Sequence, residues 1–178
     1  MDERRLVRVS KYLALHLRHA PERIGLALDP NGWADVRELL RLADAHGFAL
    51  TGAELREAVE RNDKARFELA GGRIRARQGH TVEVDLGLEP AVPPDVLFHG
   101  TNAAALPAIR ERGLLPRGRH HVHLSPDQAT ARRVGGRRGA PVVLTVDAAA
   151  MARDGHVFLV SSNGVWLTGA VPPAYQRQ

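Results

Sequence analysis

The N-terminal part of the chain begins with apolar residues at helical spacing. Four of them fall on one face of a helix: Leu6, Val9, Leu13 and Leu17. This spacing predicts a helix over residues 6–17. Pro21 ends the helix, because the residue before a proline is driven toward extended backbone.

Capping residues mark the start of two more helices. Asp35 precedes a periodic stretch over residues 36–45 and is expected to cap it. Thr51 and Glu54 form the pattern of a capping box, which opens a third helix to about Arg61.

A hairpin is predicted after the third helix, with strands over residues 66–69 and 73–77 and a turn at Ala70-Gly71-Gly72. Three helices before a hairpin are typical of a winged-helix module, which binds nucleic acid or serves as a protein scaffold. The second strand carries three alternating arginines as candidate contacts for an RNA backbone: Arg73, Arg75 and Arg77. The balanced net charge of this half of the chain argues against nucleic-acid binding, so nucleic-acid binding and a scaffold role both stay possible.

Prolines in residues 88–95 predict a linker, because they exclude both a helix and a central strand. Two domains are therefore expected, residues 1–87 and 95–178. Beyond the linker the pattern alternates short strands and short helices. The expected strands are 96–99, 119–125, 141–146, 156–160 and 165–168.

Two helices are expected among these strands, over residues 103–112 and 129–134. Ser125 is the expected cap of the second helix, with Pro126 at its first position. The C-terminal half reads as a mainly β core with short helices, and the whole chain as an α+β protein.

Residues 119–125 combine one arginine, three histidines and a serine. Alternation predicts that the two faces of this strand differ. One face holds Arg119, His121, His123 and Ser125, and the other holds His120, Val122 and Leu124. A strand face with these cations and imidazoles does not build a core, so it is expected to line a site for an anion.

The composition indicates a globular protein that handles anions in its second half. Hydrophobic residues make up 44% and charged residues 25% of the 178 positions. Residues 91–178 hold ten arginines against five acidic residues, so the net charge of +5 lies in this half. Neither a membrane span nor a signal peptide is visible, and no cysteine is present. We therefore expect a cytoplasmic protein without disulfides or membrane contact.

A metal site is not expected. The histidines at positions 120, 121 and 123 have no acidic residue nearby in the sequence, and there is no cysteine to complete a ligand set. Residues 135–139 carry glycines and arginines but lack the spacing and the lysine of a phosphate-binding P-loop.

Six short motifs, each weak by itself, occur in a fixed order. They are Leu17-Arg18-His19, Asn62 to Phe67, Gln78-Gly79-His80, His99-Gly100-Thr101, Arg119 to Ser125 and Ser162 to Val165. In this order and at this spacing, they make the chain resemble the NAD-dependent RNA (tRNA) 2′-phosphotransferases. The resemblance runs from about residue 9 to about residue 168.

The resemblance implies a fold and a reaction. Family members join an N-terminal winged-helix-like lobe to a C-terminal lobe with the ADP-ribosyltransferase fold, which binds NAD. They remove an internal 2′-phosphate from RNA, a mark left by one kind of tRNA splicing, through a 2′-phospho-ADP-ribosylated RNA. The products are RNA with a free 2′-hydroxyl, ADP-ribose 1″,2″-cyclic phosphate and nicotinamide. NAD is thus a co-substrate, the partner is a tRNA-like RNA bearing a 2′-phosphate, and neither a metal nor a protein partner is implied.

The resemblance also assigns residues. The catalytic set of the family matches four positions: Arg18, His19, Arg66 and Arg119. Seven positions match NAD contacts: His99, Gly100, Thr101, His123, Leu124, Ser125 and Arg137. His121 is expected to form a pocket wall rather than to bind directly.

Elementary chemistry agrees with these roles. A phosphate nucleophile is already anionic at neutral pH, so the first step needs arginines rather than a general base. In the second step a proton leaves the ribose 2″-hydroxyl, which suits a histidine with an ordinary pKa of about 6.5. Residues 162–166 lack the glutamate with which many ADP-ribosyltransferases bind the nicotinamide ribose, which argues against protein ADP-ribosylation.

Two other functions stay open. The same site could ADP-ribosylate a terminal phosphate on RNA or DNA, because the first step would be identical. The lesser alternative is a non-enzymatic, NAD-sensing nucleic-acid binder, although a sensor would need neither Arg18-His19 nor Arg66.

Overall fold

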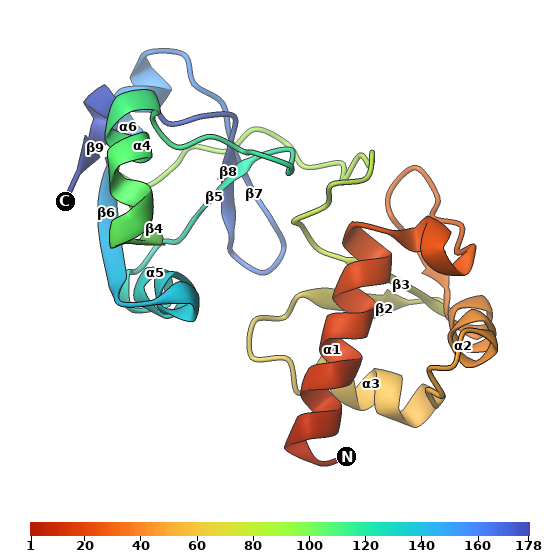
Figure 1. The fold of residues 1–178 in the computed structure, drawn as a ribbon. Coiled ribbons are helices and arrows are strands. Elements are labelled where there is room, and N and C mark those ends of the chain that lie inside the picture. The colour runs from red at the N-terminus through yellow and green to blue at the C-terminus, as the bar shows by residue number, and fades with distance from the viewer. The chain divides into compact units, whose positions relative to one another are not determined.

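The computed structural model describes residues 1–178, which form two compact units (Figure 1). The N-terminal unit is Met1–Gly87 and the C-terminal unit is Leu88–Gln178. Each unit has a hydrophobic core of its own.

The N-terminal unit contains three α-helices and one short 3-10 helix. Their bounds are α1 Glu3–Arg18, η1 Pro21–Ile24, α2 Val36–Ala45 and α3 Gly52–Glu60. Side chains cap all three α-helices: Asp2, Asp35 and Thr51 each accept the N–H of the residue three positions later. The capping box of Thr51 and Glu54 is also present, so the predicted starts of the second and third helices are confirmed.

Three antiparallel strands complete this unit, in the order β1-β3-β2. Their bounds are β1 Ala34–Asp35, β2 Phe67–Ala70 and β3 Arg73–Ala76. The hairpin turns at Gly71 and Gly72, whose φ angles of 56° and 75° are left-handed, as a tight two-residue hairpin requires. The predicted hairpin is thereby confirmed.

The apolar face of α1 forms the centre of the N-terminal core. Its buried residues are Leu6, Val9, Leu13 and Leu17, as the spacing predicts. They belong to one cluster with Leu39 of α2, Leu55 of α3 and Ile74 of β3. The sheet and the three helices thus share one core.

The C-terminal unit contains two three-stranded antiparallel sheets, with strand orders β4-β6-β9 and β5-β8-β7. The strands are β4 Val96–Asn102, β5 Val122–Leu124, β6 Pro141–Asp147, β7 Phe158–Val160, β8 Trp166–Thr168 and β9 Gln176–Arg177. The helices are η2 Ala103–Ala105, α4 Leu106–Arg112, α5 Gln128–Gly135, η3 Gly136–Arg138, α6 Ala148–Arg153 and η4 Pro173–Tyr175. Helices together with antiparallel sheets confirm the α+β class.

Two contacts fix the region around β4. Phe98 and Ser125 exchange two backbone hydrogen bonds of 2.8 Å, which join β4 to the end of β5. On β4, Gly100 faces α5 so closely that a Cβ atom there would lie 1.7 Å from the carbonyl oxygen of Ala131. Figure 1 shows α5 beside the same end of β4 and β6.

Two expectations for residues 119–127 are wrong. The regular strand covers only Val122–Leu124, because its partner β8 is three residues long and Arg119 instead closes a turn onto the carbonyl of Pro116. The cap of α5 is Asp127, not Ser125, because both backbone groups of Ser125 bond to Phe98.

Residues 88–95 contain neither a helix nor a regular strand, as their prolines predict. They pack on the C-terminal unit, where the N–H of Ala91 donates to the carbonyl of Phe158 at 2.8 Å. Six short elements were not predicted: β1, α6, β9 and the 3-10 helices η1, η3 and η4. No helix combines the length and the apolar character that crossing a bilayer requires.

Candidate active site

His19 lies at the end of α1, where a distant loop holds it. Its Nδ1 atom is 3.1 Å from the hydroxyl oxygen of Thr81. The Thr81 hydroxyl lies 3.4 Å from the backbone carbonyl of Arg18, and the N–H groups of Thr81 and Val82 donate to that carbonyl at 2.8 and 3.2 Å. Residues 81 and 82 thereby satisfy a carbonyl that the end of a helix leaves open.

These bonds select a tautomer of His19. The Thr81 hydroxyl has one proton, which points to the Arg18 carbonyl, so its oxygen accepts from His19. Nδ1 of His19 therefore carries a proton, and in the neutral ring Nε2 carries the lone pair. An imidazole oriented in this way can take up a proton at Nε2 and return it.

Arg18 is buried, with 9% of its surface exposed. Its guanidinium lies 5.9 Å from the centroid of the Phe67 ring, within the range of a cation–π contact. Because Phe67 is itself a core residue, this contact holds the charge of Arg18 in a fixed place. Arg66 directly precedes Phe67, so the structure places Arg18 and the neighbouring His19 near the start of β2, where the backbone of Arg66 lies.

A constrained loop leads into Arg66. The side-chain oxygen of Asn62 accepts the N–H of Lys64 at 3.1 Å and that of Arg66 at 3.5 Å. Between them, Ala65 has a φ of 43°, a left-handed conformation that alanine rarely adopts. Asn62 thus stabilises a strained turn next to a predicted catalytic arginine, a place where such strain is often found.

In the C-terminal unit, three sequence-predicted residues form a hydrogen-bonded chain. Nδ1 of His99, on β4, lies 3.0 Å from the carbonyl oxygen of His123, on β5. Nδ1 of His123 lies 3.4 Å from Nη1 of Arg119. Because an arginine only donates, His123 accepts through Nδ1 and its proton resides on Nε2 when the ring is neutral.

His99 is half-buried and presents an acceptor to a ligand. Burial lowers the pKa of His99, the hydrogen bond to the His123 carbonyl partly opposes this, and the charge of Arg117 lowers the pKa further. The net shift is downward, so the neutral form is favoured. With Nδ1–H donating to His123, the lone pair lies on Nε2. Such an imidazole can accept from a ribose hydroxyl or a carboxamide.

Arg119 lies in a positive environment. Although its surface is exposed, partial desolvation of the guanidinium lowers the pKa of Arg119, and the nearby charge of Arg137 lowers it further. A bound anion would reverse this unfavourable arrangement. The structure thus brings the sequence-predicted His99, His123 and Arg119 together, with Arg137 close enough to influence Arg119.

The other residues predicted to contact NAD have different surroundings. The Leu124 side chain is buried in the core, which leaves only its backbone for a ligand. Gly100 has a packing reason to be glycine, since α5 fills the space beside it. Thr101 is buried, and Ser125 is half-buried beside Phe98. Their contacts with NAD stay predictions.

The chain is similar in sequence to known proteins over nearly its whole length. The model of the RNA 2′-phosphotransferase, Tpt1/KptA family matches residues 4–170. A protein named "Probable RNA 2'-phosphotransferase" from Streptomyces griseus is 63% identical, over 98% of this chain and 97% of the relative. Relatives of the same name from Streptomyces coelicolor and Agrobacterium fabrum are 60% and 55% identical, covering 99% and 93% of this chain and 97% and 90% of their own.

The chain belongs to the RNA 2′-phosphotransferase family. The resemblance inferred from the short motifs is thereby confirmed. The four residues matched to the catalytic set of this family are divided between the two units, with Arg18, His19 and Arg66 in the first and Arg119 in the second.

The sequence analysis did not identify Thr81 and Gly135, which contact the predicted site residues His19 and Thr101 of this 2′-phosphotransferase. Thr81 directly follows the Gln78-Gly79-His80 motif, so that motif was the available signal. Gly135 opens a glycine- and arginine-rich loop, but its close approach to Thr101 depends on tertiary packing.

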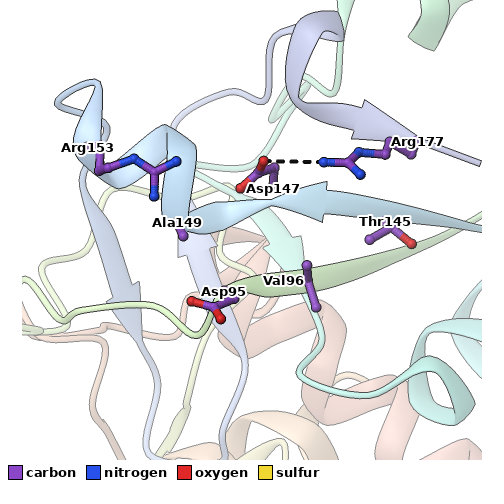
Figure 2. A pocket seen from close by; sticks show the side chains of 7 residues that line it. All are labelled: Asp95, Val96, Thr145, Asp147, Ala149, Arg153 and Arg177. Carbon is purple, nitrogen blue, oxygen red and sulfur yellow. Dashed lines mark hydrogen bonds and ion pairs between the residues drawn. The ribbon is translucent and has the colours of Figure 1, made fainter.

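A cleft of about 320 Å³ lies elsewhere on the C-terminal unit of this 2′-phosphotransferase (Figure 2). It is at the N-terminal end of β4, between Asp95, Asp147 and Arg153, and contains none of the predicted site residues. Asp147 is already engaged there, since it pairs with Arg177 at 3.5 Å and caps α6. The cleft therefore offers no support for a site built from the predicted residues.

Proposed function

We propose that this enzyme removes an internal 2′-phosphate from RNA by transferring it to NAD. The observation that carries the proposal is an arginine beside an oriented histidine in each unit, in a chain that matches the family over residues 4–170. Arg18 directly precedes His19, which Thr81 orients, and Arg119 bonds to His123. The substrate would be a tRNA-like RNA with a splicing-derived 2′-phosphate.

In the first step, an oxygen of the RNA 2′-phosphate bonds to C1″ of the nicotinamide ribose as the bond from C1″ to nicotinamide breaks. The nucleophile is already an anion, so the protein has to position it rather than deprotonate it. Arg18, Arg66 and Arg119 would hold the phosphate, since guanidinium groups match its oxygens in pairs. The product of this step is a 2′-phospho-ADP-ribosylated RNA.

In the second step, the ribose 2″-oxygen attacks the phosphorus, and the bond from phosphorus to the RNA 2′-oxygen breaks. The products are 2′-hydroxyl RNA and ADP-ribose 1″,2″-cyclic phosphate. Negative charge grows on the phosphorane oxygens, which the arginines stabilise. His19 would take the proton of the 2″-hydroxyl at Nε2 and supply one to the departing oxygen, the role for which Thr81 orients its ring.

The donors and acceptors of the C-terminal unit fit NAD. Neutral His99 offers an acceptor at Nε2, and His123 offers a donor at its Nε2, which suits ribose hydroxyl and amide groups. Arg137, exposed and close enough to influence Arg119, would contact a phosphate of NAD. When bound, NAD supplies the electrophilic ribose carbon; no metal is needed for either step.

The two units would adopt the folds of the family. Helix α1, strand β1, helices α2 and α3 and the hairpin β2–β3 follow one another in the order of a winged-helix module. The paired antiparallel sheets of the C-terminal unit support an ADP-ribosyltransferase-like NAD-binding lobe. We propose these assignments on element order and topology.

The test is incubation of the pure protein with NAD and a short RNA that bears one internal 2′-phosphate. Dephosphorylated RNA and ADP-ribose cyclic phosphate are expected, and their absence would refute the proposal. A matched RNA that carries only a terminal phosphate tests the alternative function, ADP-ribosylation of terminal phosphates. If this RNA gains a stable ADP-ribosylated end while the internal 2′-phosphate of the first RNA is not removed, the alternative is correct.

Replacing His19 with alanine should stall the second step more than the first, because only the second needs a proton carrier. ADP-ribosylated RNA should accumulate and be visible as a slower band in denaturing gels. If His19→Ala forms no such intermediate while remaining folded by circular dichroism, the role assigned to His19 is wrong.

A further inference from the structure

The N-terminal unit contains 13 arginines, of which just under half are paired with carboxylates. Six of them form ion pairs: Arg5 with Glu54, Arg41 with Glu38, Arg61 with Glu3 and Glu57, Arg73 with Asp29, and Arg75 and Arg77 with Glu68. The hairpin arginines, candidates for contacts with RNA, are therefore already engaged. In the C-terminal unit the only arginine with an ion pair is Arg177.

Four of the remaining arginines lie close together on α5 and η3: Arg132, Arg133, Arg137 and Arg138. All four are exposed. Gly135 and Gly136 both have right-handed helical dihedral angles, so the chain passes from α5 into η3 without leaving the helical path. Arg133 and Arg137 are consequently one helical turn apart and share a face.

This arrangement is unfavourable in the absence of an anion. Like charges one turn apart repel each other. The negative end of the α5 dipole stabilises cations in its last turn, which accounts for Arg132 and Arg133, but Arg137 and Arg138 lie beyond that turn. Arg133 donates a hydrogen bond to the neutral hydroxyl of Thr130 at 3.1 Å, and its charge helps to lower the pKa of Asp127 at the start of α5.

The four arginines are also fixed relative to the site strand. A Cβ atom on Gly100 would lie 1.7 Å from the Ala131 carbonyl, and one on Gly135 would lie 2.6 Å from the Thr101 carbonyl. At both glycines the backbone of α5 packs directly against the backbone of β4, so α5 has little freedom to move relative to β4. Arg137 marks the end of the group nearest the site, since its charge reaches Arg119.

We propose that Arg132, Arg133, Arg137 and Arg138, here called the α5–η3 arginine surface, bind the sugar–phosphate backbone of the RNA beside its reacting nucleotide. This inference rests on the proposed function. One pyrophosphate, as in NAD, would neutralise Arg137. Arg138 would stay uncompensated, and Arg132 and Arg133 would keep only the partial compensation that the helix dipole and, for Arg133, Asp127 provide. An extended strand places successive phosphates along the surface, and arginine forks bind phosphate oxygens in pairs.

The test compares the double variant R132Q/R133Q with the control R110Q/R112Q, and Arg137 stays unchanged. Arg110 and Arg112 are exposed near the end of α4 in the same unit, so both variants lose the same charge. Binding of a labelled single-stranded RNA without a 2′-phosphate is measured by fluorescence anisotropy at several salt concentrations, without NAD.

R132Q/R133Q should bind this RNA more weakly, and the slope of log affinity against log salt should fall by about 1.4, because each lost contact to a single strand removes about 0.7. The control should keep most of the wild-type slope. An unchanged slope in R132Q/R133Q would overturn the proposal and leave an acidic protein as the partner of this surface. An equal loss in R110Q/R112Q would overturn it too, since net charge alone would then explain binding.

Measurements of turnover distinguish a failure of this inference from a failure of the proposed function. With a 2′-phosphorylated oligonucleotide, R132Q/R133Q should raise KM for RNA several-fold and leave kcat and KM for NAD unchanged. A 2′-phosphorylated dinucleotide, too short to reach the surface, should be processed at the wild-type rate. An equal defect on the dinucleotide would refute the RNA-backbone role. A wild-type protein without any turnover would instead refute the proposed function, while the binding experiment still tests the surface.

Discussion

At the scale of single residues, Thr81 decides how His19 can act. A histidine at the end of a helix is free to rotate unless one ring nitrogen has a partner. Thr81 supplies that partner and, by donating its own proton to Arg18, also fixes which nitrogen carries the hydrogen. The proton carrier of the proposed mechanism is thus oriented by a neutral hydroxyl, which leaves the net charge of the site to the arginines.

Replacing Thr81 with valine keeps the shape of the side chain and removes this acceptor. We expect kcat to fall roughly fivefold, as loss of a hydrogen bond worth about 1 kcal/mol implies. The Thr81→Ser variant should retain most of the activity. Single-turnover measurements should show that the second chemical step is slowed more than the first. Wild-type rates in Thr81→Val, with an unchanged circular dichroism spectrum, would contradict the orienting role.

At the scale of elements, α5 and β4 are joined through glycine. Gly135 places its backbone against Thr101, and a Cβ atom there would lie 2.6 Å from the Thr101 carbonyl oxygen. Backbone atoms cannot move aside as a flexible side chain does. The glycine is therefore required by packing, although its own dihedral angles, φ −63° and ψ −35°, would suit any residue.

Gly135→Ala should consequently destabilise the C-terminal unit by roughly 1–3 kcal/mol, the usual cost of overpacking. The adjacent Gly136→Ala is the matched control, because its nearest neighbour is a Pro141 side-chain atom 3.9 Å away. Alanine there should be neutral or stabilise by up to about 1 kcal/mol. Urea unfolding followed by circular dichroism measures both. Equal stability of the two variants would show that the backbone contact between Gly135 and Thr101 can adjust to a larger residue.

A second element-scale contact ties α3 to α1. Glu54 of the α3 capping box accepts from Arg5 at 2.9 Å, and this bond, with the backbone bond from Thr51, lowers the pKa of Glu54 from 4.5 to about 2. Because the folded pKa is depressed, the stabilisation is fully present above about pH 4.5 and is lost as the pH falls toward 2.

Replacing Glu54 with glutamine should remove this pH-dependent part of the stability. At pH 7 the wild type should be the more stable by up to about 1 kcal/mol, since the pair is partly exposed to solvent. The difference should shrink as the pH is lowered from 4.5 to 2. Urea midpoints measured at several pH values test this. A difference that stays constant down to pH 2 would mean that Arg5 and Thr51 do not hold the Glu54 carboxylate.

At the scale of the whole molecule, the proposed reaction needs residues from both units. Each unit has its own core, yet the matched catalytic arginines are divided between them. If Arg18 and Arg119 act on the same phosphate, their contributions to the reaction cannot be independent.

A double-mutant cycle of Arg18→Ala and Arg119→Ala tests this dependence. Each single variant should lower kcat by roughly a hundredfold or more, as loss of a charge-stabilising donor does. The double variant should lose less than the product of the two single losses, because residues that act as a unit are not additive. Strict additivity of the two free energies would indicate that the arginines serve different groups.

The sequence by itself determined the secondary structure wherever a local physical rule applies. Helical spacing located α1, capping residues located the starts of α2 and α3, and Gly71-Gly72 located the hairpin, because each signal depends on neighbouring residues only. The ordered motifs also determined the family, since several residue types at fixed spacing rarely coincide without common descent.

Only the tertiary structure decided how the site residues are held. Thr81 reaches His19 from a distant loop, Arg119 bonds to His123, and Gly135 lies against Thr101; no local pattern encodes such contacts. The same cause explains the wrong predictions, because β5 is limited by the length of β8 and Ser125 is engaged by Phe98. The arginines show most clearly the difference between what the sequence and the tertiary structure determine. The sequence counts the arginines, but only the fold shows that those of the hairpin are paired with Glu68 and Asp29, whereas those of α5 and η3 face solvent.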